Sequence, residues 1–183
     1  VERYDPALDA WEAVAPMETA LACCGVAALD GKLYAVGGID DDGGSSSLER
    51  YDPATNAWEE MAPMATARIG CGVAVLDGKL YAAGGFHDEG GGYLNSVERY
   101  DPAANAWEEV APMGTARQIP LVAVLDGKLY AVGGEDVADT FAISNLVERY
   151  DFATKSWEEV APLAAARFSH AVAVLDGKLY AVG

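Results

Sequence analysis

The sequence predicts an all-β protein whose repeated four-stranded sheets are arranged as the blades of a β-propeller. Three observations support this prediction. The four tryptophans, Trp11, Trp58, Trp107 and Trp157, are separated by 47, 49 and 50 residues, and eight of the nine tyrosines keep the same frame. Asp-Gly recurs once per repeat between two short apolar runs, and no window has the period of a helix. A repeat of this length built from strands alone indicates a radial β architecture.

The first half of each repeat is predicted to be a β-hairpin. In the unit that follows Arg68, Gly72–Leu76 is short, apolar and rich in β-branched residues, which is typical of a buried strand. Asp77-Gly78 follows at once, and this dipeptide between apolar runs is the strongest short-range signal of a type I′ turn. Lys79–Ala83 is then the second strand, and Gly84-Gly85 ends it where the backbone must bend or pack closely.

The second half of the repeat supplies two more strands. Residues 97–100 form the third strand, and Asp101-Pro102 closes it, because aspartate bonds the backbone ahead and proline presets φ. Residues 107–110 form the fourth strand, which Pro112 stops. A single sheet of four strands is only marginally stable. Radial packing, with the repeated aromatic rings between the sheets, buries both faces and protects the short edges.

The repeated frame also resembles a known family. Gly-x-x-Tyr-Ala-Val-Gly-Gly is followed by Ser-Val-Glu-Arg-Tyr-Asp-Pro, then by Trp-x-x-Val-Ala-Pro-Met and Ala-Arg, and the double glycine, Tyr-Asp and Trp recur in register. This frame resembles the kelch repeat, a β-propeller blade, over nearly the whole chain. The residues of this frame are most similar to those of the kelch-like substrate adaptors of ubiquitin ligases. The resemblance implies a module for protein–protein recognition.

The two ends of the chain supply half-blades. Residues 1–17 carry only the third and fourth strands, residues 21–64, 68–113 and 118–163 carry complete units, and residues 168–183 carry only the first two strands. This offset is similar to the closure of kelch rings, in which the chain ends share a blade. Three arrangements stay open: part of a larger ring, a closed four-bladed ring, or eight blades from two chains. We expect the first, because the chain starts without methionine and ends inside a repeated motif.

Composition excludes several classes of function. Among 183 residues, 12 Lys+Arg against 29 Asp+Glu give a formal charge of −17, which argues against nucleic acid and anionic membranes as partners. The 51% of apolar residues indicate a folded protein, but no apolar run is long enough to span a bilayer. The three cysteines lack metal-site or disulfide spacing. We therefore expect small buried thiols in a cytoplasmic protein that uses neither metal nor cofactor.

Recognition is predicted at one rim of the propeller. With the strands of a blade named a to d, the b–c loops cover residues 39–47, 86–95 and 135–145, and they differ in length and composition. The a–b turns are Asp-Gly in every unit, which indicates a role in the fold. The b–c loops share their rim with the d–a connections, and loops on a rigid scaffold commonly carry function. A protein or peptide partner is therefore expected to bind there.

Three arginines are candidate contact residues on this rim. Arg68, Arg117 and Arg167 share one position at the start of strand a, and Leu21 occupies the fourth such place. By resemblance to the kelch-like adaptors, these arginines are predicted to bind carboxylates of a partner through the bidentate geometry of guanidinium. The alternative is that they tie strand a to neighbouring loops. The arginines of the Glu-Arg-Tyr-Asp frame are expected to be structural: Arg3, Arg50, Arg99 and Arg149.

Acidic and aromatic side chains complete the predicted rim. Three aromatic residues, Phe86, Tyr93 and Phe141, are expected to anchor a partner, because binding energy concentrates in buried aromatics. Against the three arginines stand nine acidic residues, so a basic or neutral partner is as compatible with the sequence as an acidic one. These nine are Glu18, Asp40, Asp41, Asp42, Asp88, Glu89, Glu135, Asp136 and Asp139.

Other functions remain as alternatives. Cys24, Cys71, Pro120 and His170 occupy one strand-a position in successive units, so a closed ring could gather ligands for a soft metal, although we expect none. No catalytic residues are predicted. We predict an adaptor or scaffold that binds a protein or peptide, and a ubiquitin-ligase substrate is implied by the resemblance alone. The alternatives are a carbohydrate-modifying enzyme on the same scaffold and a structural subunit of a larger assembly.

Overall fold

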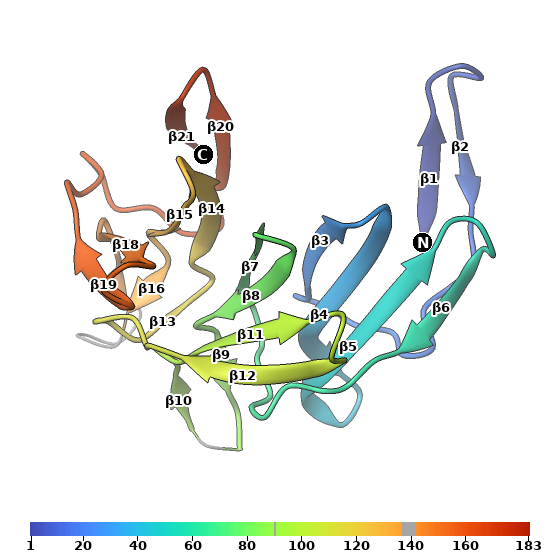
Figure 1. Cartoon of the computed structure of the whole chain (residues 1–183), viewed down its shortest axis with the longest axis horizontal. Coiled ribbons are helices and arrows are strands. Elements are labelled where there is room, and N and C mark those ends of the chain that lie inside the picture. Colours follow the sequence, from blue (N-terminus) through green and yellow to red (C-terminus); the bar gives the residue numbers. More distant parts are fainter. Residues whose placement is uncertain (90, 137–141) are drawn as a thin grey trace.

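The computed structural model describes residues 1–89, 91–136 and 142–183, and these residues form strands and turns without any helix that could cross a bilayer. Three antiparallel sheets of four strands follow one another (Figure 1), which confirms the predicted propeller blades. The first blade consists of β3 (Gly25–Leu29), β4 (Lys32–Asp40), β5 (Gly43–Asp52) and β6 (Ala57–Glu60). The second consists of β7 (Gly72–Leu76), β8 (Lys79–Ala83), β11 (Val97–Asp101) and β12 (Ala106–Val110). The third consists of β14 (Leu121–Leu125), β15 (Lys128–Val132), β18 (Val147–Asp151) and β19 (Ser156–Glu159).

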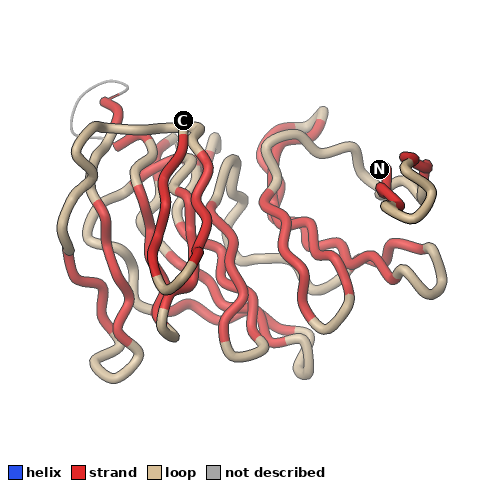
Figure 2. The backbone as a smooth tube through the Cα atoms, turned by 90° about the horizontal axis from the view of Figure 1, so that it is seen from above, coloured by secondary structure: helices blue, strands red, loops and turns tan. Residues whose placement is uncertain are grey.

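Two hairpins flank the three blades. β1 (Glu2–Asp5) pairs with β2 (Ala10–Ala13), and β20 (Ala171–Leu175) pairs with β21 (Lys178–Val182). The innermost strands pack in the order β3, β7, β14 and β20, so the sheets fan around one axis (Figure 1). Figure 2 shows the described backbone as strands joined by turns and loops. The two hairpins lie at opposite ends of this arc, and among the described residues β1 pairs only with β2 and β21 only with β20. The chain therefore forms an open arc, and its own ends do not close a four-bladed ring.

The Asp-Gly turns have the predicted geometry. Asp77 and Gly78 have φ angles of 50° and 69°, and positive φ recurs at both central residues in the other three turns. A type I′ turn requires this combination. After strand c, the carboxylate of Asp101 accepts a 2.9 Å hydrogen bond from the N–H of Ala103, which is the expected aspartate turn. Local sequence thus determines where each hairpin reverses.

Each complete blade is tied to its predecessor by a tryptophan. The indole N–H of Trp107 donates a 2.9 Å hydrogen bond to the carbonyl of Ala62 in the preceding blade, and Trp58 and Trp157 make the equivalent bond. Two apolar clusters are buried between successive sheets. At the N-terminal end of the arc, Trp11 is 67% exposed. The repeated tryptophans therefore hold blades together, because each ring buries a large apolar area and its N–H group donates one hydrogen bond.

The arginines of the Glu-Arg-Tyr-Asp frame are structural, as predicted. Arg99 on β11 donates through Nε to Glu108 on β12 at 2.9 Å, and its Nη2 forms an ion pair with the same carboxylate. Arg3, Arg50 and Arg149 pair with a glutamate of strand d in the same way. These pairs are partly exposed to solvent, so each contributes little to stability.

The b–c segments are more regular than predicted. Residues 39–47, expected to be a loop, extend β4 and β5 into a long hairpin whose register shifts after Val36. In the second blade, β9 (Phe86–His87) pairs with β10 (Gly92–Tyr93). In the third, a small sheet is formed by β13 (Arg117–Gln118), β16 (Glu135–Asp136) and β17 (Ala142–Ile143). The rim is thus built from short strand pairs.

Candidate partner-binding rim

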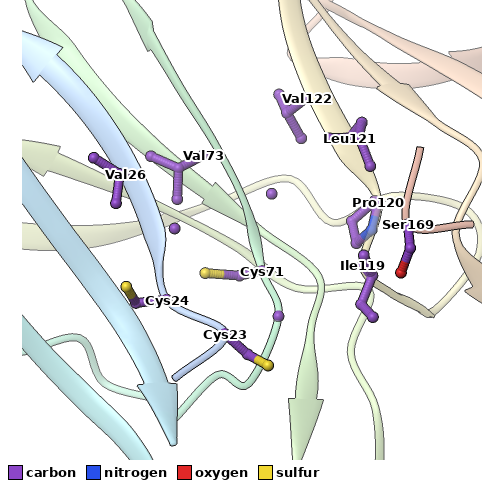
Figure 3. Close-up of a pocket in the computed structure, with 13 residues that line it drawn as sticks. Cys23, Cys24, Val26, Cys71, Val73, Ile119, Pro120, Leu121, Val122 and Ser169 are labelled. Atoms are coloured by element: carbon purple, nitrogen blue, oxygen red, sulfur yellow. The ribbon is translucent and has the colours of Figure 1, made fainter. Parts of the chain in front are cut away.

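A cavity of about 380 Å³ lies on the axis, between the innermost strands. Cys23, Cys24 and Cys71 lie on one side of it and Pro120 and Ser169 on the other (Figure 3). The expectation of buried thiols holds for Cys71 alone, because Cys24 is half-buried and Cys23 is exposed. Burial raises the pKa of the Cys71 thiol to about 11, so this sulfur is protonated at neutral pH. Within the residues that the structure describes, no three His, Cys, Asp or Glu side chains form a metal-binding group.

Hydrogen bonds between blades join the b–c segments along the rim. The carboxylate of Asp88 in the second blade accepts a 2.8 Å hydrogen bond from the N–H of Gly44 in the first, and this bond lowers the pKa of Asp88. The hydroxyl of Tyr93 donates a 3.3 Å hydrogen bond to Glu135 in the third blade. The rim is therefore one continuous surface across three blades.

Two of the predicted aromatic anchors meet at the middle of this rim. Phe86 and Tyr93 are opposite each other in the β9–β10 pair, and their rings make an edge-to-face contact with centroids 5.9 Å apart. Both side chains are half-buried. Burial and the nearby Glu135 raise the pKa of Tyr93, so its hydroxyl stays protonated. The third predicted anchor, Phe141, lies outside the described residues, as does Asp139.

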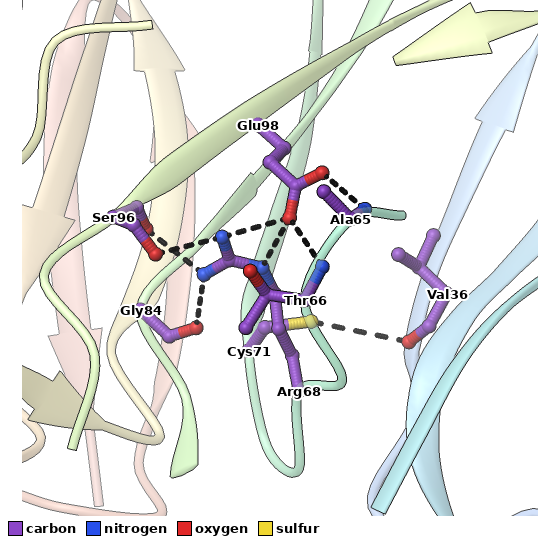
Figure 4. Close-up of polar contacts among 8 residues, drawn as sticks. All are labelled: Val36, Ala65, Thr66, Arg68, Cys71, Gly84, Ser96 and Glu98. Atoms are coloured by element: carbon purple, nitrogen blue, oxygen red, sulfur yellow. Dashed lines mark hydrogen bonds and ion pairs between the residues drawn. The ribbon is translucent and has the colours of Figure 1, made fainter. Parts of the chain in front are cut away.

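Arg68 is completely buried and points into its own blade (Figure 4). Its Nη1 donates hydrogen bonds of 2.9 Å to the carbonyls of Gly84 and Ser96. Its Nη2 donates to the hydroxyl of Ser96 at 2.8 Å and to Glu98 at 3.0 Å. Glu98 also accepts a 2.8 Å hydrogen bond from the N–H of Ala65, at the entry to strand a. The guanidinium thus joins the d–a connection to strands b and c.

The same arrangement recurs at Arg117 in the third blade. This side chain is 0% exposed, forms an ion pair with Glu148, and donates to the carbonyls of Gly133 and Leu146 at 3.3 and 3.2 Å. The expectation that Arg68 and Arg117 bind carboxylates of a partner is therefore corrected. Groups of the same blade hold both guanidinium groups, and breaking a buried ion pair is costly.

Arg167 differs from these two arginines. It lies at the C-terminal end of the arc, is half-buried, and donates through Nη1 to the carbonyl of Gly183. The strand c that would carry its glutamate is not present in this half-blade. Of the three predicted rim arginines, Arg167 alone keeps part of its surface open to solvent.

Sequence reasoning missed the glutamates that hold the buried arginines. Glu98 and Glu148 precede the arginine in the Glu-Arg-Tyr-Asp frame. The sequence contained a signal for their burial, because neighbouring side chains in a strand point to opposite faces of the sheet. Since Arg99 pairs with Glu108 on one face, Glu98 must face the other, where it is buried. A buried carboxylate requires a partner, and the arginine that begins strand a supplies it.

Comparison with known proteins matches most of the chain to one family. Residues 4–183 match a profile of the KLHDC2/KLHL20/DRC7 Kelch-repeats domain. Kelch-like protein 35 of Mus musculus is 46% identical over 43 residues, which are 24% of this chain and 8% of that protein. Kelch-like protein 5 of Homo sapiens is 58% identical over 40 residues, which are 22% of this chain and 5% of that protein. The chain thus matches less than a tenth of the length of either relative.

A solved structure, described as "Structure of YjhT", has the same fold. It superposes with a TM-score of 0.80 at 20% sequence identity, over 93% of this chain and 61% of that chain. The likeness therefore covers nearly all of the arc and only part of the larger protein.

Proposed function

This chain belongs to the kelch-repeat family of β-propellers, and we propose that it is a recognition module whose b–c and d–a rim binds a protein or peptide. The observation that carries the proposal is the continuity of the rim, in which Asp88 bonds to Gly44 and Tyr93 bonds to Glu135 between blades. Variable segments held rigidly in one surface suit recognition, because little order has to be gained on binding. The kelch-like relatives support this function, and the resemblance extends it to ubiquitin-ligase substrates as one class of partner.

We further propose that the partner surface is basic or neutral. Arg68 and Arg117 keep their charges inside the blades, each neutralised by a glutamate, so they do not offset the acidic residues of the rim. A basic segment would be attracted by this field, whereas an acidic one would be repelled. The exposed acidic residues on this rim are Glu18, Asp41, Asp42, Asp88 and Glu89.

Catalysis at the axis has weaker support. The ionisable groups that line the axial cavity include Cys24 and Cys71, and burial raises the pKa of both thiols. A thiol that stays protonated at neutral pH is a poor nucleophile. The proposal therefore stays with recognition.

Selection of random displayed peptides against the purified chain tests the proposal. We expect the selected peptides to carry net positive charge. The double change Phe86→Ala and Tyr93→Ala should weaken their binding about tenfold or more, as removal of buried aromatic anchors does. The control is Phe152→Ala, which removes an aromatic ring from a c–d turn on the opposite rim and should leave affinity unchanged. Enrichment of acidic peptides, or equal losses in both variants, would contradict the proposal.

A further inference from the structure

The first blade departs from the other two at the start of strand a. Aligning the repeats places Leu21 where the second and third blades have Arg68 and Arg117. In those blades the guanidinium is fully buried and is held by a strand-c glutamate and by backbone carbonyls. The first blade therefore has the architecture of this site without its cation.

Glu49 nevertheless keeps the position that Glu98 has in the second blade. It accepts hydrogen bonds of 3.0 and 3.3 Å from the backbone N–H groups of Glu18 and Thr19. The equivalent bonds to Glu98 come from Ala65 and the next residue, at 2.8 and 3.3 Å. Glu49 is 3% exposed. The described residues include every lysine and arginine of the chain, and none of these forms an ion pair with Glu49.

A cavity of about 160 Å³ lies beside this carboxylate. Ser47 lines this cavity. It is the counterpart of Ser96, whose hydroxyl and carbonyl both accept hydrogen bonds from Arg68. Glu60 lies opposite Glu49 in the β5–β6 pairing and adds a further carboxylate. We call this cavity the first-blade notch, and it is lined by Glu18, Thr19, Ser47, Glu49 and Glu60.

We propose that the first-blade notch binds the guanidinium group of an arginine side chain presented by the partner protein. This inference rests on the proposed function, because the notch lies on the same rim, and it names the chemistry of one contact. A carboxylate buried without a cation is destabilising, and a cation supplied from outside relieves that cost. Glu18 and Glu60 are both exposed, so their charges attract a cation to the notch.

The arrangement of acceptors favours a guanidinium over an ammonium group or a metal ion. In the second blade the equivalent site presents a carboxylate, a hydroxyl and two carbonyls to the planar guanidinium of Arg68 (Figure 4). A guanidinium carries five N–H donors in one plane, whereas an ammonium is a compact point charge. Since two backbone bonds orient Glu49 as they orient Glu98, the notch is organised before its ligand arrives.

The direct test is a titration of the purified chain with N-acetylarginine amide, followed through the backbone amide signals of Glu18 and Thr19 by NMR. N-acetylcitrulline amide is the matched probe, since it keeps the shape of arginine without its charge. N-acetyllysine amide keeps a charge without the planar fork. We expect saturable shifts with the arginine probe, binding about tenfold or more weaker with the lysine probe, and no saturable response to citrulline.

Variants of the first blade separate the notch from a non-specific acidic surface. Leu21→Arg supplies a guanidinium from the chain itself, so we expect it to abolish the saturable shifts and to raise the thermal midpoint. Glu49→Gln keeps the size of the side chain and should weaken binding about tenfold or more, because a charge-assisted hydrogen bond is lost. Leu21→Val is the matched control and should bind the arginine probe as the unaltered chain does.

Equal responses to arginine and citrulline, or undiminished binding by Leu21→Arg, would overturn the proposal. Saturation by Ca²⁺ together with no response to the arginine probe would also overturn it. Failure of the notch is distinguishable from failure of the rim. Selected peptides that bind the unaltered chain and Leu21→Arg equally, but lose affinity with Phe86→Ala and Tyr93→Ala, would retain the rim and reject the notch.

Discussion

Oε1 of Glu98 lies 3.0 Å from Nη2 of Arg68, and both side chains are closed off from solvent. The pair joins the connection that enters strand a to the strand two places further out in the same sheet. It is therefore part of the blade's internal structure, although its arginine stands at a position where a contact with a partner was predicted. The pair recurs at Arg117 and Glu148, so it is shared by the second and third blades.

Removing one member of this pair should be strongly destabilising. We expect Arg68→Met to lower the free energy of unfolding by about 3–5 kcal/mol, because Glu98 would remain buried without a cation. Arg99→Met is the control, since it breaks the partly exposed pair with Glu108 and should cost about 1 kcal/mol or less. Urea unfolding of both variants measures the difference, and equal losses would contradict the assignment of Arg68 as structural.

The tryptophans should differ in importance along the arc. Trp107→Phe removes the hydrogen bond to Ala62 and leaves that carbonyl without its donor, so we expect a loss of about 1–2 kcal/mol. Trp11→Phe changes the equivalent residue at the exposed N-terminal hairpin and should fall within about 0.5 kcal/mol of the unaltered chain. Chemical unfolding compares them, and a larger effect at Trp11 would refute this account of blade packing.

Two glycines should be required for different reasons. A Cβ at Gly72 would lie 2.4 Å from Cγ2 of Val122 and 2.6 Å from the carbonyl of Pro120, so Gly72→Ala should force the innermost strands apart. A Cβ at Gly78 meets open space, and only its φ of +69° disfavours alanine, at about 1 kcal/mol. We expect Gly72→Ala to be clearly the more destabilising in urea. The reverse order would mean that close approach of blades is not the constraint at Gly72.

Stability should fall at alkaline pH because of Cys71. Burial raises the pKa of this thiol from near 9 to about 11, so between those values the unfolded chain loses a proton that the folded chain keeps. The contribution is complete below pH 9 and is lost as the pH rises to 11, amounting to about 2–3 kcal/mol. Unfolding free energies measured across this range should decline less steeply for Cys71→Ala. Parallel declines would exclude Cys71 as the source.

The blade itself was largely predictable, because its determinants are local. Asp77 and Gly78 adopt the φ angles that their dipeptide predicts, and the apolar runs on either side form the expected strands. The spacing of the tryptophans indicated the packing of successive sheets, and the hydrogen bond from Trp107 to Ala62 is its structural counterpart. The short rim pairs were not predicted, because Phe86 and Tyr93 are held together partly by contacts with neighbouring blades.

The order of residues alone determined the repeat, its turns and the all-β architecture, since these follow from side-chain periodicity and from the φ preferences of a few residues. Only the tertiary structure decided whether the arginine that begins strand a faces solvent or the interior. That choice depends on the path of the d–a connection and on a glutamate about 30 residues further along the chain, as with Arg68 and Glu98. The same long-range relationship explains the consequence of Leu21. Because leucine replaces the arginine there, Glu49 is buried with no cation of its own chain beside it.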